Sequence, residues 1–180
     1  HSGFKGTWLS NILILAGADV TGYACEPPTD PSLFQLTGTA KKIHSIIGDI
    51  RDHDRLVSAV KDTRPDILLH LAAQPIVRLS YREPVETYET NVMGTVNILE
   101  AVRASDSVRS FVNVTTDKVY RNREWPWPYR ENDELGGHDP YSASKAAAEM
   151  IVESYARCLC PPEKGTAIAV ARGGNIVGVG

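Results

Sequence analysis

Cysteine is scarce in this sequence of 180 residues, which contains only Cys25, Cys158 and Cys160. An odd and sparse set of this kind fits a reducing compartment better than a disulfide scaffold. Cys158 and Cys160 have neither a second cysteine pair nor a nearby histidine, which argues against a zinc site. We therefore expect a cytoplasmic protein with no bound metal.

The sequence also lacks an excess of positive charge and any long apolar run. Its formal net charge is -3 and its pI is near 6.0. Without a basic surface, nucleic acid is not an expected partner. No stretch of 18 apolar residues and no signal-peptide pattern occurs, so no association with a membrane is expected. A hydrophobic content of 42% is enough for a core in one domain or two small ones.

Two apolar patterns alternate along the chain. A period near 3.6 residues indicates helices, and short apolar runs indicate buried strands. The predicted helices are 5–16, 51–62, 84–105 and 139–159, the predicted strands are 19–25, 42–49, 65–73, 108–116 and 166–174, and the predicted loops are 26–40 and 121–138. This order predicts an α/β fold with a doubly wound parallel sheet, buried on both faces, which binds ligands at the carboxyl ends of its strands.

Both ends of the sequence are unusual for a whole protein. It opens on "HSGFKG", a glycine-bearing loop with no strand before it, and closes on "GNIVGVG" (174–180), which follows a strand with no helix after it. We expect residues 1–180 to be one domain truncated at both ends and lacking its first strand. We also expect this fragment by itself to fold poorly and to be inactive.

The opening loop has the glycine spacing of a phosphate-binding turn. Gly3 and Gly6 match the last two glycines of a G-x-x-G-x-x-G loop, which lets backbone approach a pyrophosphate at a helix amino end. Glu26, about 20 residues further on, can bind ribose hydroxyls and repel a 2′-phosphate, which favours NAD over NADP. The alternatives are an ordinary glycine turn and a surface acid.

The stretch "GDIRD" (48–52) follows the next predicted strand. Asp49 at this point can accept a hydrogen bond from an adenine amino group while Ile50 packs on the ring. The alternative is a helix amino-terminal cap supplied by Asp49 or Asp52. Both roles can hold together.

Tyr141 and Lys145 in "YSASK" lie four residues apart on a predicted helix and hence on one face. A close ammonium stabilises a phenolate and lowers the pKa of the tyrosine, which makes it a usable base. Such a pair also arises by chance. Asn91, in the middle of another predicted helix, either orders this active-site helix and its water or belongs to a helix–helix contact beside Gly94.

The predicted strand 108–116 ends in "TTDK". A solvated turn is one interpretation of Thr116, Asp117 and Lys118. The other is a catalytic cluster at the carboxyl end of the strand, because proton transfer needs an acid and a base held near the substrate.

Together these residues resemble the extended short-chain dehydrogenase/reductase superfamily, and within it the nucleotide-sugar 4,6-dehydratases. The resemblance covers the whole chain and is carried by "PPTDPSLF", "HSIIGDIRD", "LAAQPIVRLSYREPVETYETNVMGTVN", "VNVTTDKVYRNREW", "YRENDELGGHDPYSASKAAAE" and "ARGGNIVG". Lys118 stands at a position where most dTDP-glucose dehydratases have glutamate. In having lysine there, the chain resembles the branch that acts on CDP-glucose. The resemblance implies a Rossmann-type NAD-binding domain whose C-terminal substrate domain is missing here.

The resemblance also implies site residues. NAD contacts are expected at Gly3, Phe4, Gly6, Glu26, Asp49, Ile50, Leu71, Ala72, Ala73, Gln74, Thr90, Tyr141 and Lys145, the catalytic residues are Thr116, Asp117, Lys118, Tyr141 and Lys145, and the substrate contacts are Thr116 and Asn175. The family's helices equivalent to 84–105 and 139–159 form a dimer interface, so a homodimer is expected.

The implied reaction is the NAD-dependent dehydration of CDP-glucose to CDP-4-keto-6-deoxyglucose, a hydro-lyase reaction. Tyr141 takes the proton from the sugar 4-hydroxyl, hydride passes from C4 to NAD, water is lost across C5 and C6, and hydride returns to C6. Asp117 is the expected acid, which requires burial to raise its pKa, and Lys118 is the candidate C5 base. The alternatives are another nucleotide-sugar 4,6-dehydratase, a sugar-nucleotide 4-epimerase, which needs no "TDK", and a cofactor-binding regulatory protein without catalysis.

Overall fold

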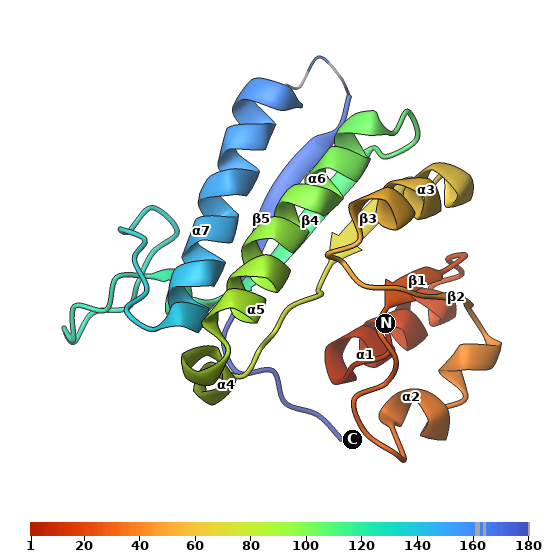
Figure 1. The fold of residues 1–180 in the computed structure, drawn as a ribbon, viewed down its shortest axis with the longest axis horizontal. Helices are drawn as coiled ribbons and strands as arrows, with labels where there is room; N and C mark the ends of the chain where they lie inside the picture. The colour runs from red at the N-terminus through yellow and green to blue at the C-terminus, as the bar shows by residue number, and fades with distance from the viewer. Residues whose placement is uncertain (161–162, 164, 180) are drawn as a thin grey trace.

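Helices and strands alternate along the chain in the computed structural model, which describes residues 1–160, 163 and 165–179 (Figure 1). Residue 180, the last of the closing stretch 174–180, lies outside the described residues. The strands are β1 (Thr21–Ala24), β2 (His44–Ile47), β3 (Ile67–His70), β4 (Ser110–Thr116) and β5 (Ala167–Gly173). The helices are α1 (Phe4–Leu15), α2 (Leu33–Leu36), α3 (His53–Thr63), α4 (Val77–Arg82), α5 (Pro84–Tyr88), α6 (Gly94–Ala104) and α7 (Pro140–Ser154), with the shorter turns η1 (Thr39–Lys41), η2 (Glu89–Met93), η3 (Asp117–Val119) and η4 (Tyr155–Leu159).

All strand pairs are parallel, which confirms the predicted α/β class. The strands form two sheets instead of the single sheet that the sequence predicts: β1 pairs with β2, and β4 lies between β3 and β5. No described strand hydrogen-bonds to both β1 and β3, so the two sheets stay separate. The register pairs Asn113 with His70 on one side and Thr116 with Gly173 on the other. The carboxyl ends of β4 and β5 therefore meet at one edge.

One face of the larger sheet carries the main core. Helices α3, α6 and α7 lie side by side over it, as Figure 1 shows. The buried apolar side chains between these layers are Ile50, Leu56, Val60, Ile98, Leu99, Ala101, Val102, Val108, Phe111 and Val152.

The opposite face of this sheet is only partly covered by the described residues. Along β5, Ile168 and Val170 pack against the core, whereas the three intervening alanines are exposed. Ile67 of β3 is 62% exposed. The expectation that the sheet is buried on both faces is therefore wrong for this part of the chain, because the helices that follow its strands pack on one side.

The long predicted helices carry a local change of pitch. Residues 84–104 run through α5, η2 and α6, and η2 has the wider π-type turn around Asn91. Such turns interrupt α-helices mostly at functional sites. Helix α7 ends similarly in η4. Among the described helices, none has the length and apolar character needed to cross a bilayer.

The prediction of a loop over 26–40 is wrong in its second half, where α2 and η1 form. Ser32 and Gln35 make a capping box, in which each side chain accepts a hydrogen bond from the other's backbone N–H. This reciprocal pair satisfies two donors at the helix start. Helix α4 was also not predicted, and Pro84 separates it from α5 because the residue before a proline disfavours helical geometry.

Candidate active site

Strand β4 delivers Thr116 to the carboxyl edge, where the chain turns at once into η3. The Thr116 hydroxyl donates to Oδ1 of Asp117 at 3.0 Å and accepts from the backbone N–H of Lys118 at 3.4 Å. The threonine thus caps the turn that holds the acid and the base. The interpretation of "TTDK" as a turn is correct in its geometry, and it does not exclude the catalytic interpretation, because the turn lies at the strand end.

Helix α7 begins beside this turn. Asp139 is its amino-terminal cap and accepts from the backbone N–H and the hydroxyl of Ser142, at 2.9 and 2.5 Å. Pro140 occupies the first helical position, where no backbone donor is needed. Tyr141 therefore stands in the first turn, and its backbone N–H donates to the hydroxyl of Ser80 on α4 at 3.2 Å.

Lys145 lies one turn further along α7 and is 5% exposed. Its ammonium donates to the carbonyl of Val114 at 3.0 Å, so the helix is attached to β4 two residues before Thr116. Burial lowers the pKa of Lys145 to about 8, with the positive charge of Lys5 acting in the same direction and Glu149 opposing both.

Tyr141 is half-buried, and burial raises the pKa of its phenol. A hydrogen bond with Thr116 lowers that pKa, while the negative charges of Asp117 and Asp139 raise it further. The expectation that Lys145 lowers the pKa of Tyr141 is therefore wrong for this arrangement. The lysine directs its ammonium to a backbone carbonyl, and desolvation of the phenol is the larger effect.

Asp117 and Lys118 are both exposed. The acid and base roles inferred for them require burial, which the described residues do not provide. The segment after β5 approaches them: a Cβ placed on Gly174 would lie 3.7 Å from Oδ2 of Asp117. Asn175, the predicted contact for the substrate diphosphate, follows that glycine and is exposed.

Asn91 connects three segments at this edge. Its side-chain oxygen accepts from the backbone N–H of Gln74 at 2.8 Å, and its amide donates to the Gln74 carbonyl at 3.1 Å and to the Ser144 hydroxyl at 2.9 Å. Ser144 in turn donates to the carbonyl of Tyr141. The loop after β3, the π-type turn η2 and helix α7 are thereby fixed to one another, which supports the interpretation of Asn91 as a residue that orders the active-site helix.

His70 is buried at the end of β3, as expected of a core histidine. Its ring contacts the Thr95 hydroxyl at 3.3 Å and stacks on Phe111. Burial, aided by the charge of Lys145, lowers the pKa of His70 to about 3, so the ring is neutral at physiological pH. Asn113 on β4 pairs in register with His70 and is also buried. Unlike the His70 ring, its side-chain amide has no hydrogen-bond partner among the described residues.

The two glycines of the amino-terminal loop differ in their surroundings. Gly3 caps α1, and a Cβ placed on it would meet no atom within 4 Å, so the space in front of it is open. Gly6 has no such room, since its Cβ would lie 2.7 Å from the backbone of His1. Ser2 donates to the carbonyl of Cys25 at 2.8 Å, which fixes this loop beside the end of β1, where Glu26 is exposed.

At the end of β2, the roles proposed for "GDIRD" separate. Asp52 is the helix cap, since it accepts from the backbone N–H of Arg55. Asp49 instead forms a bidentate ion pair with Arg51, and hydrogen bonding from this arginine lowers the pKa of Asp49. Ile50 lies in the core and packs on Gly94, whose Cβ would approach it to 2.8 Å. Packing of the Ile50 side chain on a ligand ring is therefore not available.

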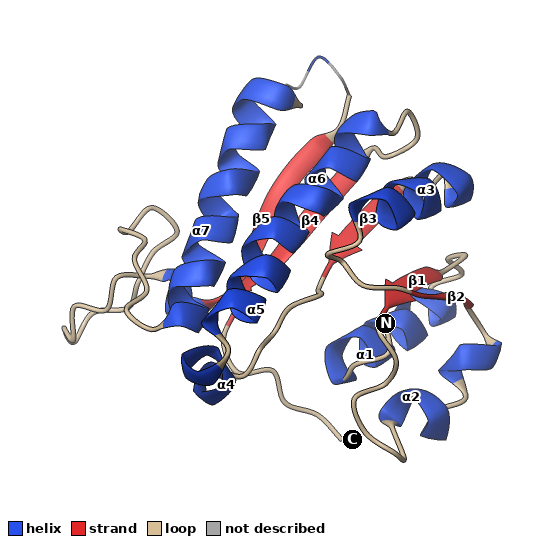
Figure 2. Ribbon diagram, in the orientation of Figure 1, coloured by secondary structure: helices blue, strands red, loops and turns tan. Residues whose placement is uncertain are grey.

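Three of the remaining predicted cofactor residues follow the end of β3, and two lie in helical segments. Leu71, Ala72 and Ala73 come directly after β3 and are half-buried, Thr90 lies in η2, and Phe4 opens α1. The predicted aromatic loop 121–138 extends from the start of α7 in Figure 2 and carries Trp125 and Trp127 exposed. Thr115, Glu149 and Arg172, which the sequence did not predict, form a network under this site in which Thr115 and Glu149 are buried and the Arg172 side chain is 19% exposed. The spacing of Glu149 four residues after Lys145, on the same helix face, was the available signal.

The chain was compared with known proteins. A family model described as GDP-mannose 4,6 dehydratase matches residues 1–159. The CDP-glucose 4,6-dehydratase of Salmonella typhimurium is 48% identical over an alignment that covers 100% of this chain and 51% of that protein. This chain thus spans about half the length of the curated relatives it matches.

Two solved structures have the same fold. UDP-glucose 4-epimerase from Thermotoga maritima, with UDP-glucose, is 26% identical with a TM-score of 0.80, over 95% of this chain and 52% of that one. A dTDP-glucose 4,6-dehydratase from Streptomyces venezuelae, with NAD bound, is also 26% identical, with a TM-score of 0.79 over the same shares. The predicted fold class, a Rossmann-type parallel sheet with flanking helices, is confirmed.

Proposed function

Because the chain belongs to the GDP-mannose 4,6 dehydratase family, we propose that the protein of which it forms at least a part dehydrates a nucleotide-activated hexose with NAD as cofactor. We propose CDP-glucose as the substrate and CDP-4-keto-6-deoxyglucose as the product. The 48% identity to a CDP-glucose 4,6-dehydratase supports this choice of nucleotide. The activity belongs to the whole protein, since the chain spans half the length of that relative.

The observation that carries the proposal is the meeting of four groups at the carboxyl end of β4. Thr116 caps the turn that holds Asp117, and Tyr141 hydrogen-bonds to that same threonine. Lys145 is attached to β4 just beneath them. A hydroxyl, a phenol, an ammonium and a carboxylate at one edge are the groups that oxidation followed by loss of water requires.

The residues of this chain fit NAD. The open space before Gly3 at the amino end of the twelve-residue helix α1 suits a pyrophosphate, which backbone N–H groups and the helix dipole favour. Glu26 is exposed at the end of β1, where it can accept from ribose hydroxyls. Asp49 accepts four hydrogen bonds from Arg51, two on each carboxylate oxygen, so it would have to give up one of them to accept from an adenine amino group.

When bound, NAD supplies the hydride acceptor and donor for the reaction. Tyr141, as phenolate, takes the proton from the sugar 4-hydroxyl, and Thr116 holds the oxygen by a hydrogen bond. Lys145 fixes α7 to β4 through the Val114 carbonyl and so holds Tyr141 beside the strand end. Asp117 protonates the leaving 6-hydroxyl, and Lys118 takes the C5 proton. The last two roles require that the bound sugar and the rest of the protein cover side chains that are exposed here.

Turnover of CDP-, dTDP-, GDP- and UDP-glucose by the whole protein tests the proposal. A 4-keto-6-deoxy sugar absorbs in alkali, and an epimerised sugar does not. We expect the absorbing product from CDP-glucose at the highest kcat/KM. Activity on none of the four sugars would contradict the proposal, and activity confined to another nucleotide would contradict the choice of CDP-glucose.

A sugar-nucleotide 4-epimerase is the second candidate, because the Thermotoga maritima epimerase has the same fold over most of this chain. Epimerisation uses the 4-ketone without the loss of water, so Asp117 and Lys118 would be dispensable. A Lys118→Ala protein should lose dehydration, with the exposed Arg121→Ala as a matched control at the same loop. Full dehydration by Lys118→Ala would refute the base role of this lysine.

We also propose that the whole protein is a cytoplasmic homodimer. Exposed apolar side chains gather on the neighbouring helices α4, α5, η2 and α7, where a second copy would cover them: Tyr81, Val85, Tyr88, Met93 and Met150. A Met150→Glu protein should sediment as a monomer. Leu36→Glu, which changes an exposed leucine on α2, should leave the dimer intact, and a monomeric unmodified protein would refute the proposal.

A further inference from the structure

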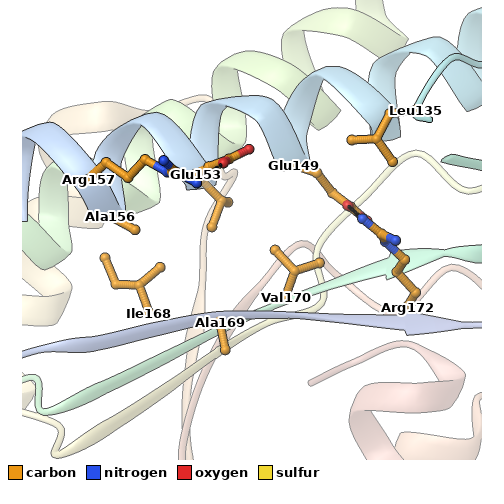
Figure 3. Close-up of a pocket in the computed structure, with 10 residues that line it drawn as sticks. Leu135, Glu149, Glu153, Ala156, Arg157, Ile168, Ala169, Val170 and Arg172 are labelled. Atoms are coloured by element: carbon orange, nitrogen blue, oxygen red, sulfur yellow. Dashed lines mark hydrogen bonds and ion pairs between the residues drawn. The ribbon is translucent and has the colours of Figure 1, made fainter. Parts of the chain in front are cut away.

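Beneath the candidate site lies a buried acid that the proposed reaction does not use. Glu149 is 4% exposed and comes from α7, one turn after Lys145. It faces Arg172 of β5, and Figure 3 shows the two side chains meeting between the helix and the strand. The guanidinium donates to both carboxylate oxygens, at 2.6 to 3.0 Å. The pair therefore joins the helix of Tyr141 and Lys145 to the last strand of the sheet.

The same carboxylate also holds the strand that ends in the candidate site. The hydroxyl of Thr115 on β4 donates to Oε1 of Glu149 at 2.5 Å. Thr115 precedes Thr116 directly, and it pairs in register with Arg172. One acid thus accepts from β4 and from β5 while it stands on α7, so it joins the two elements that carry Thr116, Tyr141 and Lys145 to the last strand.

The arginine extends this network to the loop 121–138. Its guanidinium lies 4.7 Å from the ring centre of Tyr120, the residue that ends the turn of Asp117 and Lys118. Tyr120 stacks on Tyr129 of the loop 121–138, with ring centres 5.0 Å apart. Arg172 also donates to the carbonyl of Glu131 in that loop at 2.8 Å.

Stability alone does not account for such a pair. Burying both charges costs desolvation that their attraction scarcely offsets, and apolar side chains of equal size are often as stable. A neighbouring pair on the same helix shows the contrast. Glu153 and Arg157 lie 2.7 Å apart one turn later, and their side chains are 60% and 75% exposed. They line the pocket drawn in Figure 3 together with Glu149 and Arg172. Among the described residues, no hydrogen bond joins the exposed pair to a strand, whereas Glu149 accepts from both β4 and β5.

We infer that Glu149 and Arg172 are positioning residues, which hold Tyr141, Lys145 and Thr116 in the geometry that proton transfer from the sugar requires. This inference rests on the proposed function. Glu149 and Arg172 lie behind the reacting groups, so they act through α7, β4 and β5. A displacement of about 1 Å at reacting atoms can cost on the order of 100-fold in rate.

The test is Glu149→Gln in the whole protein, with Glu153→Gln as the matched control on the same helix. Glutamine keeps the shape and an acceptor for Thr115 but removes the charge that orients Arg172. We expect kcat to fall by on the order of 100-fold, with the KM for the nucleotide sugar and the affinity for NAD unchanged. The Glu153→Gln protein should behave as the unmodified one.

Two further variants keep the test decisive if Glu149→Gln does not fold. Thr115→Val removes one donor without leaving a charge unpaired, and Arg172→Lys keeps the charge but loses the fork geometry. Each should lower kcat by a smaller factor at unchanged KM. A full rate in these variants, or a fall in kcat, substrate affinity and melting temperature together, would overturn the inference.

A readout without substrate separates this inference from the proposed function. Amide hydrogen exchange at residues 116–119 and 141–145 should become faster in Glu149→Gln and stay unchanged in Glu153→Gln. If the unmodified protein turns over no sugar but shows this difference, the proposed function fails and the positioning role stands. Equal exchange in both variants would overturn the positioning role whatever the activity.

Discussion

The polar residues near the two sheets of this protein differ in how deeply they are buried. Near the carboxyl ends of β3, β4 and β5, four polar side chains are enclosed by protein: Asn91, Thr116, Lys145 and Glu149 are each less than 10% exposed, whereas Asp117 and Lys118 after β4 are exposed. At the end of β1 and β2, the acids Glu26 and Asp49 are exposed or half-buried, and the loop of Gly3 offers backbone.

This difference follows from what each edge has to do. Proton transfer needs side chains with fixed positions and shifted proton affinities, and only a buried network supplies both. A dinucleotide is held by backbone N–H groups and by acceptors that water can reach, so the second edge needs little buried apolar surface. The comparison predicts large effects of substitution at the first edge and small effects at the second.

The largest expected effect is that of Tyr141→Phe. The substitution removes the phenolic hydroxyl and leaves the rest of this half-buried side chain unchanged. We expect kcat for dehydration to fall by about 10² to 10⁴, the usual contribution of a general base. Binding of NAD, measured by calorimetry, should persist, and a variant with an appreciable fraction of the original rate would contradict the base role.

Leu99→Ala tests the core that supports the first edge. Leu99 is fully buried in the cluster between α6 and β4, so its truncation should cost about 2 to 5 kcal/mol of unfolding free energy. Ile12→Ala on α1 is the control, because that side chain is 57% exposed and should change stability by less than about 0.5 kcal/mol. Urea denaturation measures both, and equal losses would refute the contrast between the two regions.

Lys145→Met separates function from stability. Burial lowers the pKa of Lys145 from 10.5 in the unfolded chain to about 8, so below pH 8 the buried charge opposes folding. The unfolding free energy should therefore rise as pH increases from about 8 to about 10.5, where the folded state has lost the proton that the unfolded state retains.

In the methionine variant this rise should vanish. The variant should also be more stable at neutral pH, by up to about 3 kcal/mol, while its activity is lost. Lys61→Met, on the exposed side of α3, is the control and should show neither change. Denaturation curves at several pH values measure the effect, and a variant less stable at neutral pH would contradict it.

The smallest expected effect lies at the second edge. Glu26→Ser removes an exposed carboxylate that would repel a 2′-phosphate, and a charge pair near 4 Å in water is worth about 1 kcal/mol. The preference for NAD over NADP should fall roughly fivefold. Affinities for the two cofactors measure this change, and an unaltered ratio would show that Glu26 does not face the ribose.

Local patterns were enough to predict most elements. All five predicted strands are present, and the apolar periods located α1, α3 and α7 to within a few residues. Helices α2 and α4 were not predicted because they are short and depend on a capping box and on contacts with α7. The π-type turn η2 has no periodic signal, since it depends on the bonds that Asn91 makes to a distant loop and helix.

The sequence could predict which residues form the candidate site, but it could not predict how these residues are buried. Spacing on one helix is a local property, so Tyr141 and Lys145 could be paired from the sequence. Their proton affinities depend on what surrounds them, and burial of Tyr141 reverses the direction expected of its pKa. Burial of Asp117 was likewise expected and is not found. Glu149 was overlooked because its partners Thr115 and Arg172 are distant in sequence.

The amino-acid sequence is enough to say which groups can take part in the site and in what order they occur along the chain. Alternating apolar periods define a parallel α/β fold, and such a fold brings its strand ends to one edge. Which of these groups are buried from solvent depends on the three-dimensional packing. Burial depends on packing between segments far apart in the chain, and it is burial that attaches Lys145 to β4, encloses Glu149 and leaves Lys118 in water.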